Sequence, residues 1–246
     1  MFDELMRAGW PAIEEARVDG WIARFSSGVT QRANSVVPKA APADLDAAIA
    51  TVQDLYEQRG LPTLFQLTPG TDLDHALAAR GYVGGSPTSV HTVDLGTPRA
   101  APGVDIADAP DQDWLDLWWA VDGRGDSDAL AVAQKILAGG PALYATVRDE
   151  HGAAGVGRLA LVDDWGGVYC LAVRPDARRR GLGRLVLDGL LAAGRERGIT
   201  RSWLQVRAEN LGARRLYQRA GYTEVSRYHY RSHRRQEPVQ HVHPET

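Results

Sequence analysis

The segment Val173–Arg184, VRPDARRRGLGR, places a turn rich in arginine and glycine between two regular elements. Before it, Gly167–Val173 is a short apolar run bounded by glycines and an Arg-Pro pair, which predicts a strand. After it, leucine and valine recur at helical spacing as far as Gly198, which predicts a helix that ends there. The order strand, turn, helix indicates an α/β fold in which the helix begins close to the end of the strand.

This turn has the composition of an anion-binding site. A helix begins with unpaired N–H groups and the positive end of its dipole, and both attract an anion. Gly181 and Gly183 lack the side chains that would keep a phosphate away from the backbone. The charges that suit phosphate geometry belong to Arg178, Arg179, Arg180 and Arg184. The turn predicts a site for a phosphate-bearing ligand, with a solvated basic turn as the alternative. It is neither a Walker loop nor a complete dinucleotide fingerprint.

The residues after this helix continue the alternation of strand and helix. Arg201–Val206 predicts a strand, a helical pattern follows as far as Gly221, and Tyr222–Tyr230 predicts another strand. At the start of that helix Asn210 suits an N-cap, and within it Tyr217 suits a packed aromatic side chain. Neither of these two interpretations requires a ligand.

Together these segments resemble the GNAT superfamily of N-acetyltransferases. Arg178, Gly181 and Gly183 occupy the fixed places of its acetyl-CoA loop, Gln/Arg-x-x-Gly-x-Gly/Ala. Asn210 and Tyr217 then follow in the family's order, where the Asn helps to hold the pantetheine arm and the Tyr lies near the thioester sulfur. The pair Gly221-Tyr222 completes the pattern.

The resemblance implies transfer of an acetyl group from acetyl-CoA to a primary amine, by direct attack of the amine in a ternary complex. Tyr217 would protonate the departing thiolate, a slightly uphill step from a phenol of pKa about 10 to a thiol of pKa about 8.5. The general base that deprotonates the amine is not assigned, because Val168–Val173 contains no carboxylate. The candidates for this base are Asp122, Asp126, Glu209 and a water chain. The implied acetyl-CoA-binding residues are Leu171, Ala172, Val173, Arg178, Arg179, Arg180, Gly181, Leu182, Gly183, Arg184, Asn210 and Tyr217.

The chain also contains an internal repeat. The run Leu64–Val83 aligns with Trp203–Val225, and both read strand, helix, Gly-Tyr, strand. An amphipathic helix is expected over Asp44–Arg59, and Gly96–Gly103 is the expected linker. The first copy has Leu77 where the second has Tyr217, and no arginine turn.

This pattern resembles tandem GNAT proteins with a degenerate N-terminal half, which we expect to bind no CoA. The predicted fold is α/β, with an α+β mixed sheet: two GNAT-like halves, each a mixed central sheet flanked by helices. Residues 1–98 would form the degenerate half, residues 99–232 the catalytic half, and residues 233–246 a flexible tail.

Two segments are candidates for binding the amine acceptor. Trp21–Pro38 carries Arg24, Arg32 and Asn34, which would face a groove between the halves and bind an acidic acceptor through its carboxylate. The alternative is a hairpin with one polar, solvated face. The segment also shows a weaker resemblance to acetylglutamate-synthase-like tandem members, which makes an amino acid such as glutamate one candidate acceptor.

The second segment follows an expected amphipathic helix that contains Trp114 and Trp118. In GNAT folds the loop after this helix overlies the acceptor site. The resemblance therefore adds Asp122, Arg124 and Asp126 as substrate candidates, with a solvated charged turn as the alternative.

The composition of the chain limits the classes of ligand, partner and cellular location that it can have. A net charge of −3 over 246 residues argues against general nucleic-acid binding. The single cysteine, Cys170, excludes an internal disulfide and is expected to be a small buried side chain. No run is long and apolar enough for a membrane span, and no leader is evident, so we expect a cytoplasmic monomer or homodimer. No metal is expected; a site at His241 and His243 in the tail is the less favoured alternative. A non-catalytic acyl-CoA-binding regulatory module and a protein-lysine acetyltransferase remain alternatives to a small-molecule enzyme.

Overall fold

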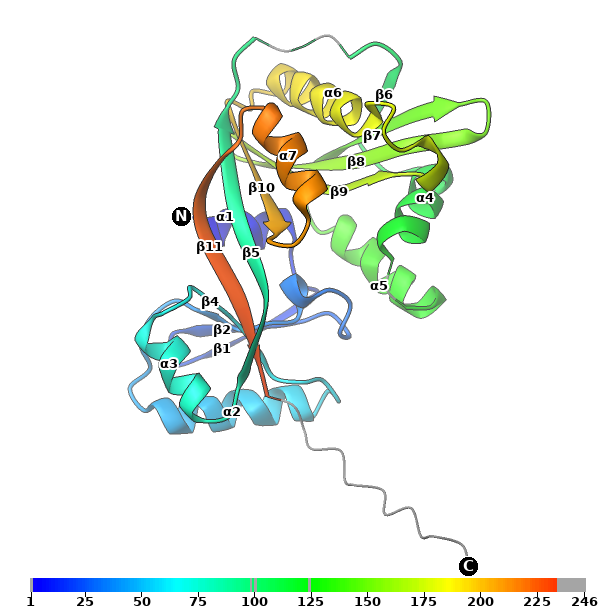
Figure 1. Cartoon of the computed structure of the whole chain (residues 1–246). Helices are drawn as coiled ribbons and strands as arrows, with labels where there is room; N and C mark the ends of the chain where they lie inside the picture. The colour runs from blue at the N-terminus through cyan, green and yellow to red at the C-terminus, as the bar shows by residue number, and fades with distance from the viewer. Residues whose placement is uncertain (1, 98, 100, 124, 234–246) are drawn as a thin grey trace, which may run out of the picture.

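A computed structural model describes residues 2–97, 99, 101–123 and 125–233 (Figure 1). The helices are α1 (Phe2–Gly9), α2 (Leu45–Glu57), α3 (Asp72–Ala79), α4 (Gln112–Asp122), α5 (Ser127–Leu137), α6 (Leu182–Glu196) and α7 (Leu211–Arg219). The strands are β1 (Glu14–Val18), β2 (Trp21–Phe25), β3 (Val37–Pro38), β4 (Leu64–Leu67), β5 (Val83–Asp94), β6 (Val104–Ala107), β7 (Ala142–Asp149), β8 (Gly152–Val162), β9 (Trp165–Val173), β10 (Arg201–Arg207) and β11 (Thr223–Ser232). Short 3-10 turns lie at Gln31–Ala33 and Pro175–Ala177.

The strands form one large mixed sheet and one small sheet, which confirms the expected mixed α/β fold. The large sheet has the order β4-β11-β5-β10-β9-β8-β7-β6, and the small one has the order β1-β2-β3. Within the large sheet β9 and β10 are parallel, whereas the other neighbours are antiparallel.

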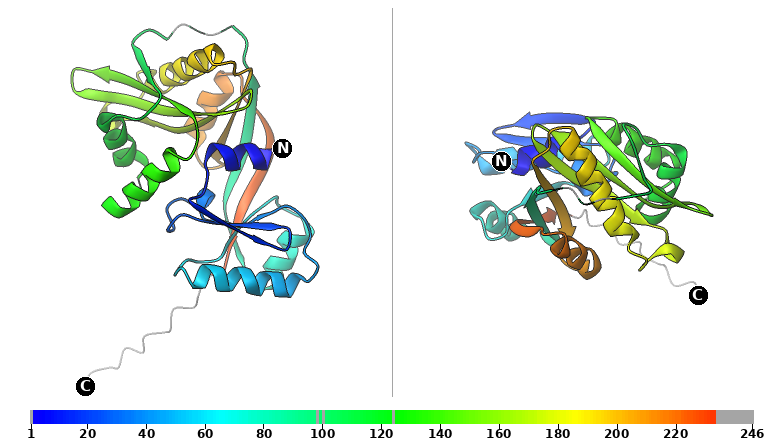
Figure 2. Two further views of the ribbon diagram at one scale, coloured as in Figure 1. Left: turned by 180° about the vertical axis from the view of Figure 1, so that it is seen from behind. Right: turned by 90° about the horizontal axis from the view of Figure 1, so that it is seen from above.

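Helices cover both faces of the large sheet. Neighbouring residues of one strand point to opposite faces, and Trp203 and Leu204 on β10 belong to different buried clusters. The cluster around Trp203 includes residues of α1, α4 and α5. The cluster around Leu204 includes residues of α6 and α7. Seen from behind, α1 lies between the upper sheet and the lower part of the molecule (Figure 2).

Two long strands join the halves of the chain. β5 precedes the expected linker, yet it pairs with β10 on one side and with β11 on the other. β11, the last strand, pairs in turn with β4 of the N-terminal half. Figure 1 shows β5 and β11 side by side from the upper to the lower part of the molecule. The two halves therefore share one sheet, and the expected division into one central sheet per half does not describe the strand pairing.

The aligned segments have the same local geometry. Helix α3 ends with hydrogen bonds from Gly81 N–H to the Ala78 carbonyl and from Tyr82 N–H to the Leu77 carbonyl. At the end of α7, Gly221 N–H bonds to Gln218 and Tyr222 N–H bonds to Tyr217 in the same way. Gly81 and Gly221 have φ angles of 83° and 92°, a conformation that favours glycine.

The segment Trp21–Pro38 differs from the solvated hairpin considered from the sequence. All five residues of β2 are buried, and the end of the segment returns to pair with its start as β3. Arg24 and Asn34 are also buried, so the polar residues do not form a solvated face.

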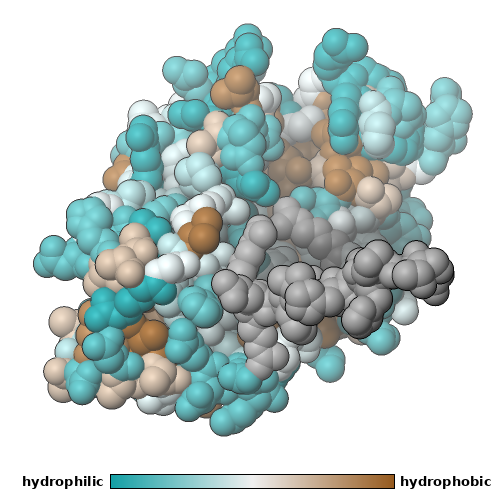
Figure 3. Space-filling model, turned by 60° about the horizontal axis from the view of Figure 1, so that its bottom comes forward, coloured by the Kyte–Doolittle hydropathy of each residue, from teal (hydrophilic) through white to brown (hydrophobic). Residues whose placement is uncertain are grey.

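The outer surface is mainly hydrophilic on the face shown in Figure 3, where hydrophobic residues occur in small separate groups. Among the described residues no helix combines the length and the apolar character that a membrane span requires.

Candidate active site

The glycine-rich turn leaves the start of α6 open. Gly181 is the N-cap residue with a φ of 83°, and no side chain caps the helix. A Cβ atom on Gly181 would meet nothing within 4 Å, so the space in front of the first N–H groups is free. A Cβ atom on Gly183 would lie at ordinary contact distance from Val173 on β9 and Leu216 on α7. The turn therefore fits an anion held by backbone N–H groups.

The arginines of the turn do not all point to this space. Arg178 donates from Nε to the Val173 carbonyl, and Arg184 pairs with Asp188 at 2.8 Å and donates to the Arg219 carbonyl. Arg180 lies 3.5 Å from Asp149, and Arg179 is exposed with a φ of 61°. The first two side chains thus brace the turn, while Arg179 and Arg180 remain the more accessible charges.

The strands β9 and β10 separate next to the turn. Their parallel pairing runs from Arg201 and Trp165 to Leu204 and Val168 and ends there. The edge of β9 from Tyr169 to Val173 therefore faces an opening, and it contains the predicted Leu171, Ala172 and Val173. A free strand edge next to an open helix N-terminus suits the amide-containing arm and the phosphates of CoA.

A β-bulge lies at the point of separation. Cys170 and Leu171 together face Gly157 of β8, and Cys170 has a φ of 54°. A bulge bends a strand and re-aims its backbone groups, and such features concentrate at active sites. Burial raises the pKa of the Cys170 thiol to about 12, so the thiol keeps its proton at neutral pH and is a poor nucleophile.

The residues predicted on α7 lie on the same side. Asn210 caps the helix, accepting from the Ala213 N–H, as the simpler interpretation of the sequence requires. Tyr217 is 8% exposed, and its ring packs edge-on against Tyr222. Burial raises the pKa of Tyr217 to about 12, and the nearby Arg32 guanidinium opposes that shift. Although Tyr217 and Arg32 belong to different halves of the chain, the charge of Arg32 is close enough to act on the Tyr217 hydroxyl.

A cavity of about 80 Å³ lies where the halves meet. Arg32 contributes from the N-terminal half, Asp122 from α4 and Cys170 from the bulge. The remaining lining residues include Trp118, Trp119, Arg207, Tyr228 and Tyr230. This cavity is therefore the candidate acceptor site.

The other predicted acceptor residues have local partners. Arg24 donates to the Ser35 carbonyl, the Ser35 hydroxyl and Gln66, and Asn34 bonds to the backbone of its own loop. Asp126 accepts from two N–H groups at the start of α5. These contacts favour structural roles for the three side chains. Arg124 lies outside the described residues.

Sequence reasoning missed several cavity residues. The spacing of Trp118 fits an amphipathic helix and that of Tyr228 and Tyr230 fits an ordinary strand, so the sequence indicates a core position for each. Outside the cavity lining, the fully buried Arg158 donates to the Gly9 and Leu137 carbonyls, at the ends of α1 and α5. A charged residue within an apolar strand was the available signal.

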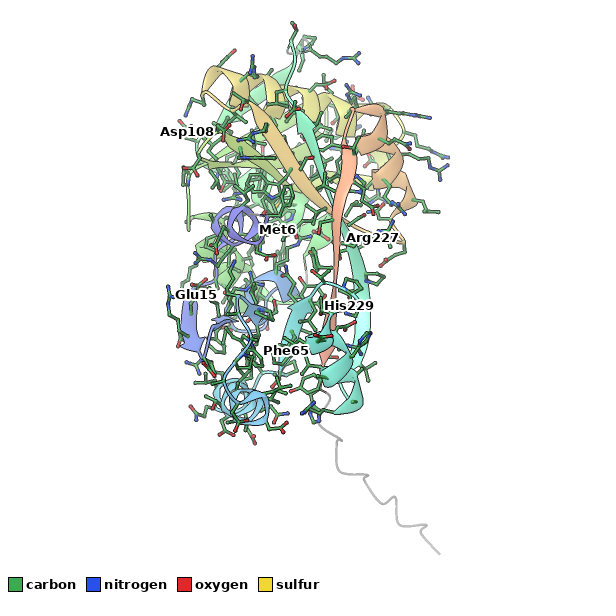
Figure 4. The ribbon with its side chains drawn as sticks, turned by 90° about the vertical axis from the view of Figure 1, so that its left-hand side faces the viewer. Met6, Glu15, Phe65, Asp108, Arg227 and His229 are labelled. Carbon is green, nitrogen blue, oxygen red and sulfur yellow. The ribbon has the colours of Figure 1, made fainter. Side chains whose placement is uncertain are left out.

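A larger cavity of about 620 Å³ occupies the corresponding place in the N-terminal half. It lies beside β3 and β4, next to the parallel bridge between Val36 and Phe65. Figure 4 shows this side of the molecule, with Met6 on α1 and Arg227 on β11, which both line the cavity. Here the Asp44 carboxylate accepts from the Asp46 and Ala47 N–H groups at the start of α2. An anion at this helix start would meet a carboxylate instead of free N–H groups.

Among the described residues no group of three or more His, Cys, Asp or Glu is placed to hold a metal ion. The predicted histidines of the tail, His241 and His243, lie outside these residues.

Comparisons with known proteins identify the family of this chain. Residues 3–231 match the family model described as "Probable histone acetyltransferase Rv0428c C-terminal". The "Uncharacterized N-acetyltransferase YobR" of Bacillus subtilis is 26% identical over 238 residues, covering 93% of this chain and 96% of that protein.

Two solved structures share the fold. A GCN5-related N-acetyltransferase from Kribbella flavida has a TM-score of 0.68 at 19% identity, over 94% of each chain. A tandem GNAT protein from the clavulanic acid biosynthesis pathway has a TM-score of 0.62 at 14% identity, over 94% of this chain and 86% of that one. Since the family model covers nearly the whole chain, the protein belongs to the Rv0428c C-terminal family and is a GNAT N-acetyltransferase.

Proposed function

We propose that the enzyme transfers the acetyl group of acetyl-CoA to the primary amine of a small molecule in a ternary complex. The open start of α6 beside the free edge of β9 carries this proposal, because together they fit the phosphates and the arm of CoA. The cavity at the bulge holds the acceptor close to the same strand edge.

In this mechanism the amine nitrogen attacks the thioester carbonyl carbon, so that a C–N bond forms and the C–S bond breaks. Tyr217 gives its proton to the departing thiolate. Asp122 takes the proton that the amine loses; of the three carboxylates considered as bases, it is the one that lines the cavity. Glu209 instead lies 2.5 Å from Arg207.

We also propose that the N-terminal half is a degenerate GNAT-like unit, with the predicted boundaries of residues 1–98 and 99–232. The matching helix ends at Leu77 and Tyr217 support the repeat, and the Asp44 cap supports the loss of phosphate binding. Calorimetric titration with CoA should give one site per chain. A second site of similar affinity would contradict the degeneracy.

The test of activity is thiol release from acetyl-CoA with a panel of amino acids, aminoglycosides, polyamines and lysine peptides. Turnover of lysine peptides alone would favour a protein-lysine acetyltransferase, which the family's description makes the second candidate. CoA binding without thiol release from any acceptor would favour a regulatory module.

A further inference from the structure

The candidate acceptor cavity contains buried hydrogen-bond donors without partners. Tyr230 and Trp118 both line the cavity and are 4% and 3% exposed, and the Tyr230 hydroxyl and the Trp118 indole N–H are buried. Neither atom has a hydrogen-bond partner of good geometry among the described residues. An unsatisfied buried donor is destabilising, so two in one small cavity indicate that a ligand supplies the acceptor atoms.

The same cavity has an excess of positive charge. Arg32 lines it beside the Tyr228 hydroxyl and has no carboxylate partner among the described residues. Its guanidinium lies 5.8 Å from the centre of the Tyr169 ring, and Arg158 lies at the same distance from that ring. The hydrogen-bond partners of Arg158 are two carbonyls and the Tyr144 hydroxyl, all neutral. Arg32 and Arg158 thus lie near the same aromatic ring, and among the described residues that line the cavity Asp122 is the single carboxylate beside Arg32 and Arg207.

The shape of the cavity restricts the ligand further. Guanidinium and indole N–H groups can only donate, and a carboxylate can only accept. A volume of about 80 Å³ suits a carboxylate and the carbon atoms next to it rather than a large body. Asp122 lines the same cavity and provides a negative charge for an ammonium group.

We infer that this cavity binds the carboxylate of the acceptor through Arg32, Tyr230 and Trp118, so that the acceptor is a free amino acid. The inference rests on the proposed function and specifies its substrate class. A carboxylate on Arg32 and an amino group near Asp122 bring the nitrogen toward the bulge at Cys170.

The first experiment compares acceptors that differ in the carboxylate alone. Alanine and glutamate are assayed for thiol release against their α-amides, alaninamide and isoglutamine, and alanine also against its decarboxylated partner, ethylamine. Alaninamide has a less basic amine, so a larger fraction of it is unprotonated at neutral pH, and it should react at least as well as alanine if the carboxylate is not recognised. We expect alanine or glutamate to exceed its amide or decarboxylated partner in kcat/KM by at least about 100-fold. Equal or better turnover of the partners would overturn the inference.

The second experiment uses Arg32→Gln and the conservative Tyr230→Phe. Arg32→Gln should lower kcat/KM for the amino acid by about 100-fold while leaving the acetyl-CoA KM unchanged. Arg17→Gln, an exposed residue on β1, is the matched control. Tyr230→Phe should raise the amino-acid KM about 10-fold with little change in Tm, because the hydroxyl that it removes makes no hydrogen bond of good geometry among the described residues and has the Tyr228 hydroxyl as its neighbour. A lower Tm with an unchanged KM would show that the hydroxyl is structural and contradict the proposed carboxylate site.

Measuring the binding of amino acids directly distinguishes a failure of this inference from a failure of the proposed function. Calorimetry with glutamate and alanine on the CoA-bound protein should give heats that Arg32→Gln removes. Absence of these heats, or turnover of lysine peptides alone, would refute the amino-acid site while leaving acetyl transfer intact. Failure of CoA itself to bind would refute the proposed function.

Discussion

Tyr217 is a single residue for which both a structural and a catalytic role can be argued. Its ring packs in the core between α7 and the sheet, as any buried aromatic side chain would. Burial raises the pKa of its hydroxyl, and the positive charge of Arg32 acts on the same group in the opposite direction. Because burial raises its pKa to about 12, the hydroxyl keeps its proton throughout the pH range of ordinary assays. It is therefore always in the form that a general acid requires, although the raised pKa makes proton transfer to a thiolate more uphill than from an ordinary phenol.

Tyr217→Phe tests this role. The substitution removes one proton donor and almost no volume, so Tm and acetyl-CoA affinity should change little. The value of kcat should fall about 100-fold, and the loss should shrink with acyl donors whose thiol is more acidic. Stopped assays with two acyl donors, together with thermal unfolding, measure the difference. Near-normal turnover with every donor would leave Tyr217 a structural residue.

Helix starts distinguish the two halves at the scale of single elements. α6 begins at a glycine without a side-chain cap, whereas the Asp44 carboxylate caps α2. These elements were predictable from the sequence, because turn glycines, N-caps and hydrophobic spacing are local signals. The directions of Arg178 and Arg184 were not predictable, since their partners, the Val173 carbonyl and Asp188, are settled only when strand, turn and helix pack together.

Gly181→Trp and Gly198→Trp form a matched pair just outside the two ends of α6. Both glycines have positive φ angles, 83° and 88°, and neither Cβ position meets an atom within 4 Å. Each substitution should therefore cost a similar amount of stability, about 1–2 kcal/mol for a left-handed residue. Only Gly181→Trp fills the space in front of the open helix start, so it should abolish CoA binding in calorimetry. Equal CoA affinity for the two folded variants would place the phosphate site elsewhere.

At the scale of the whole molecule, the sequence did not reveal an exchange of strands between the halves: β5 of the N-terminal half pairs with β10, and β11 of the C-terminal half pairs with β4. The repeat of Leu64–Val83 and Trp203–Val225 predicted two similar units, and it gave no reason for β5 to lie next to β10. Such pairing depends on contacts far apart in the chain, such as His91 with Leu204 and with Glu224. The acceptor cavity was hidden for the same reason, because Arg32 and Tyr230 meet only after this exchange.

Asp74 on α3 stabilises the exchanged strand through His229 and Arg231 of β11. Burial alone would raise its pKa, but Arg231, the Gly70 N–H and His229 lower it to about 2. A carboxyl with a lowered pKa stabilises the fold above its unfolded value of about 3.9 and loses this effect as pH falls toward 2. Asp74→Asn should lower the free energy of unfolding by about 1.5–3 kcal/mol at neutral pH. In denaturant titrations the difference should shrink between about pH 4 and pH 2, and an unchanged difference over this range would contradict the role of the Asp74 charge.

Cutting the chain within Gly96–Gly103 tests the shared sheet most directly. The N-terminal fragment would keep β5 but lose both of its neighbours, β10 and β11, while the C-terminal fragment would have a gap between those strands. Each fragment would expose unpaired strand edges and apolar side chains, so neither should fold alone. Co-expressed fragments should assemble and regain CoA binding, because the chain crosses between the halves once, at this linker. Circular dichroism and amide exchange on each fragment measure the result. A C-terminal fragment that folds and binds CoA by itself would show that β5 is dispensable to the catalytic half.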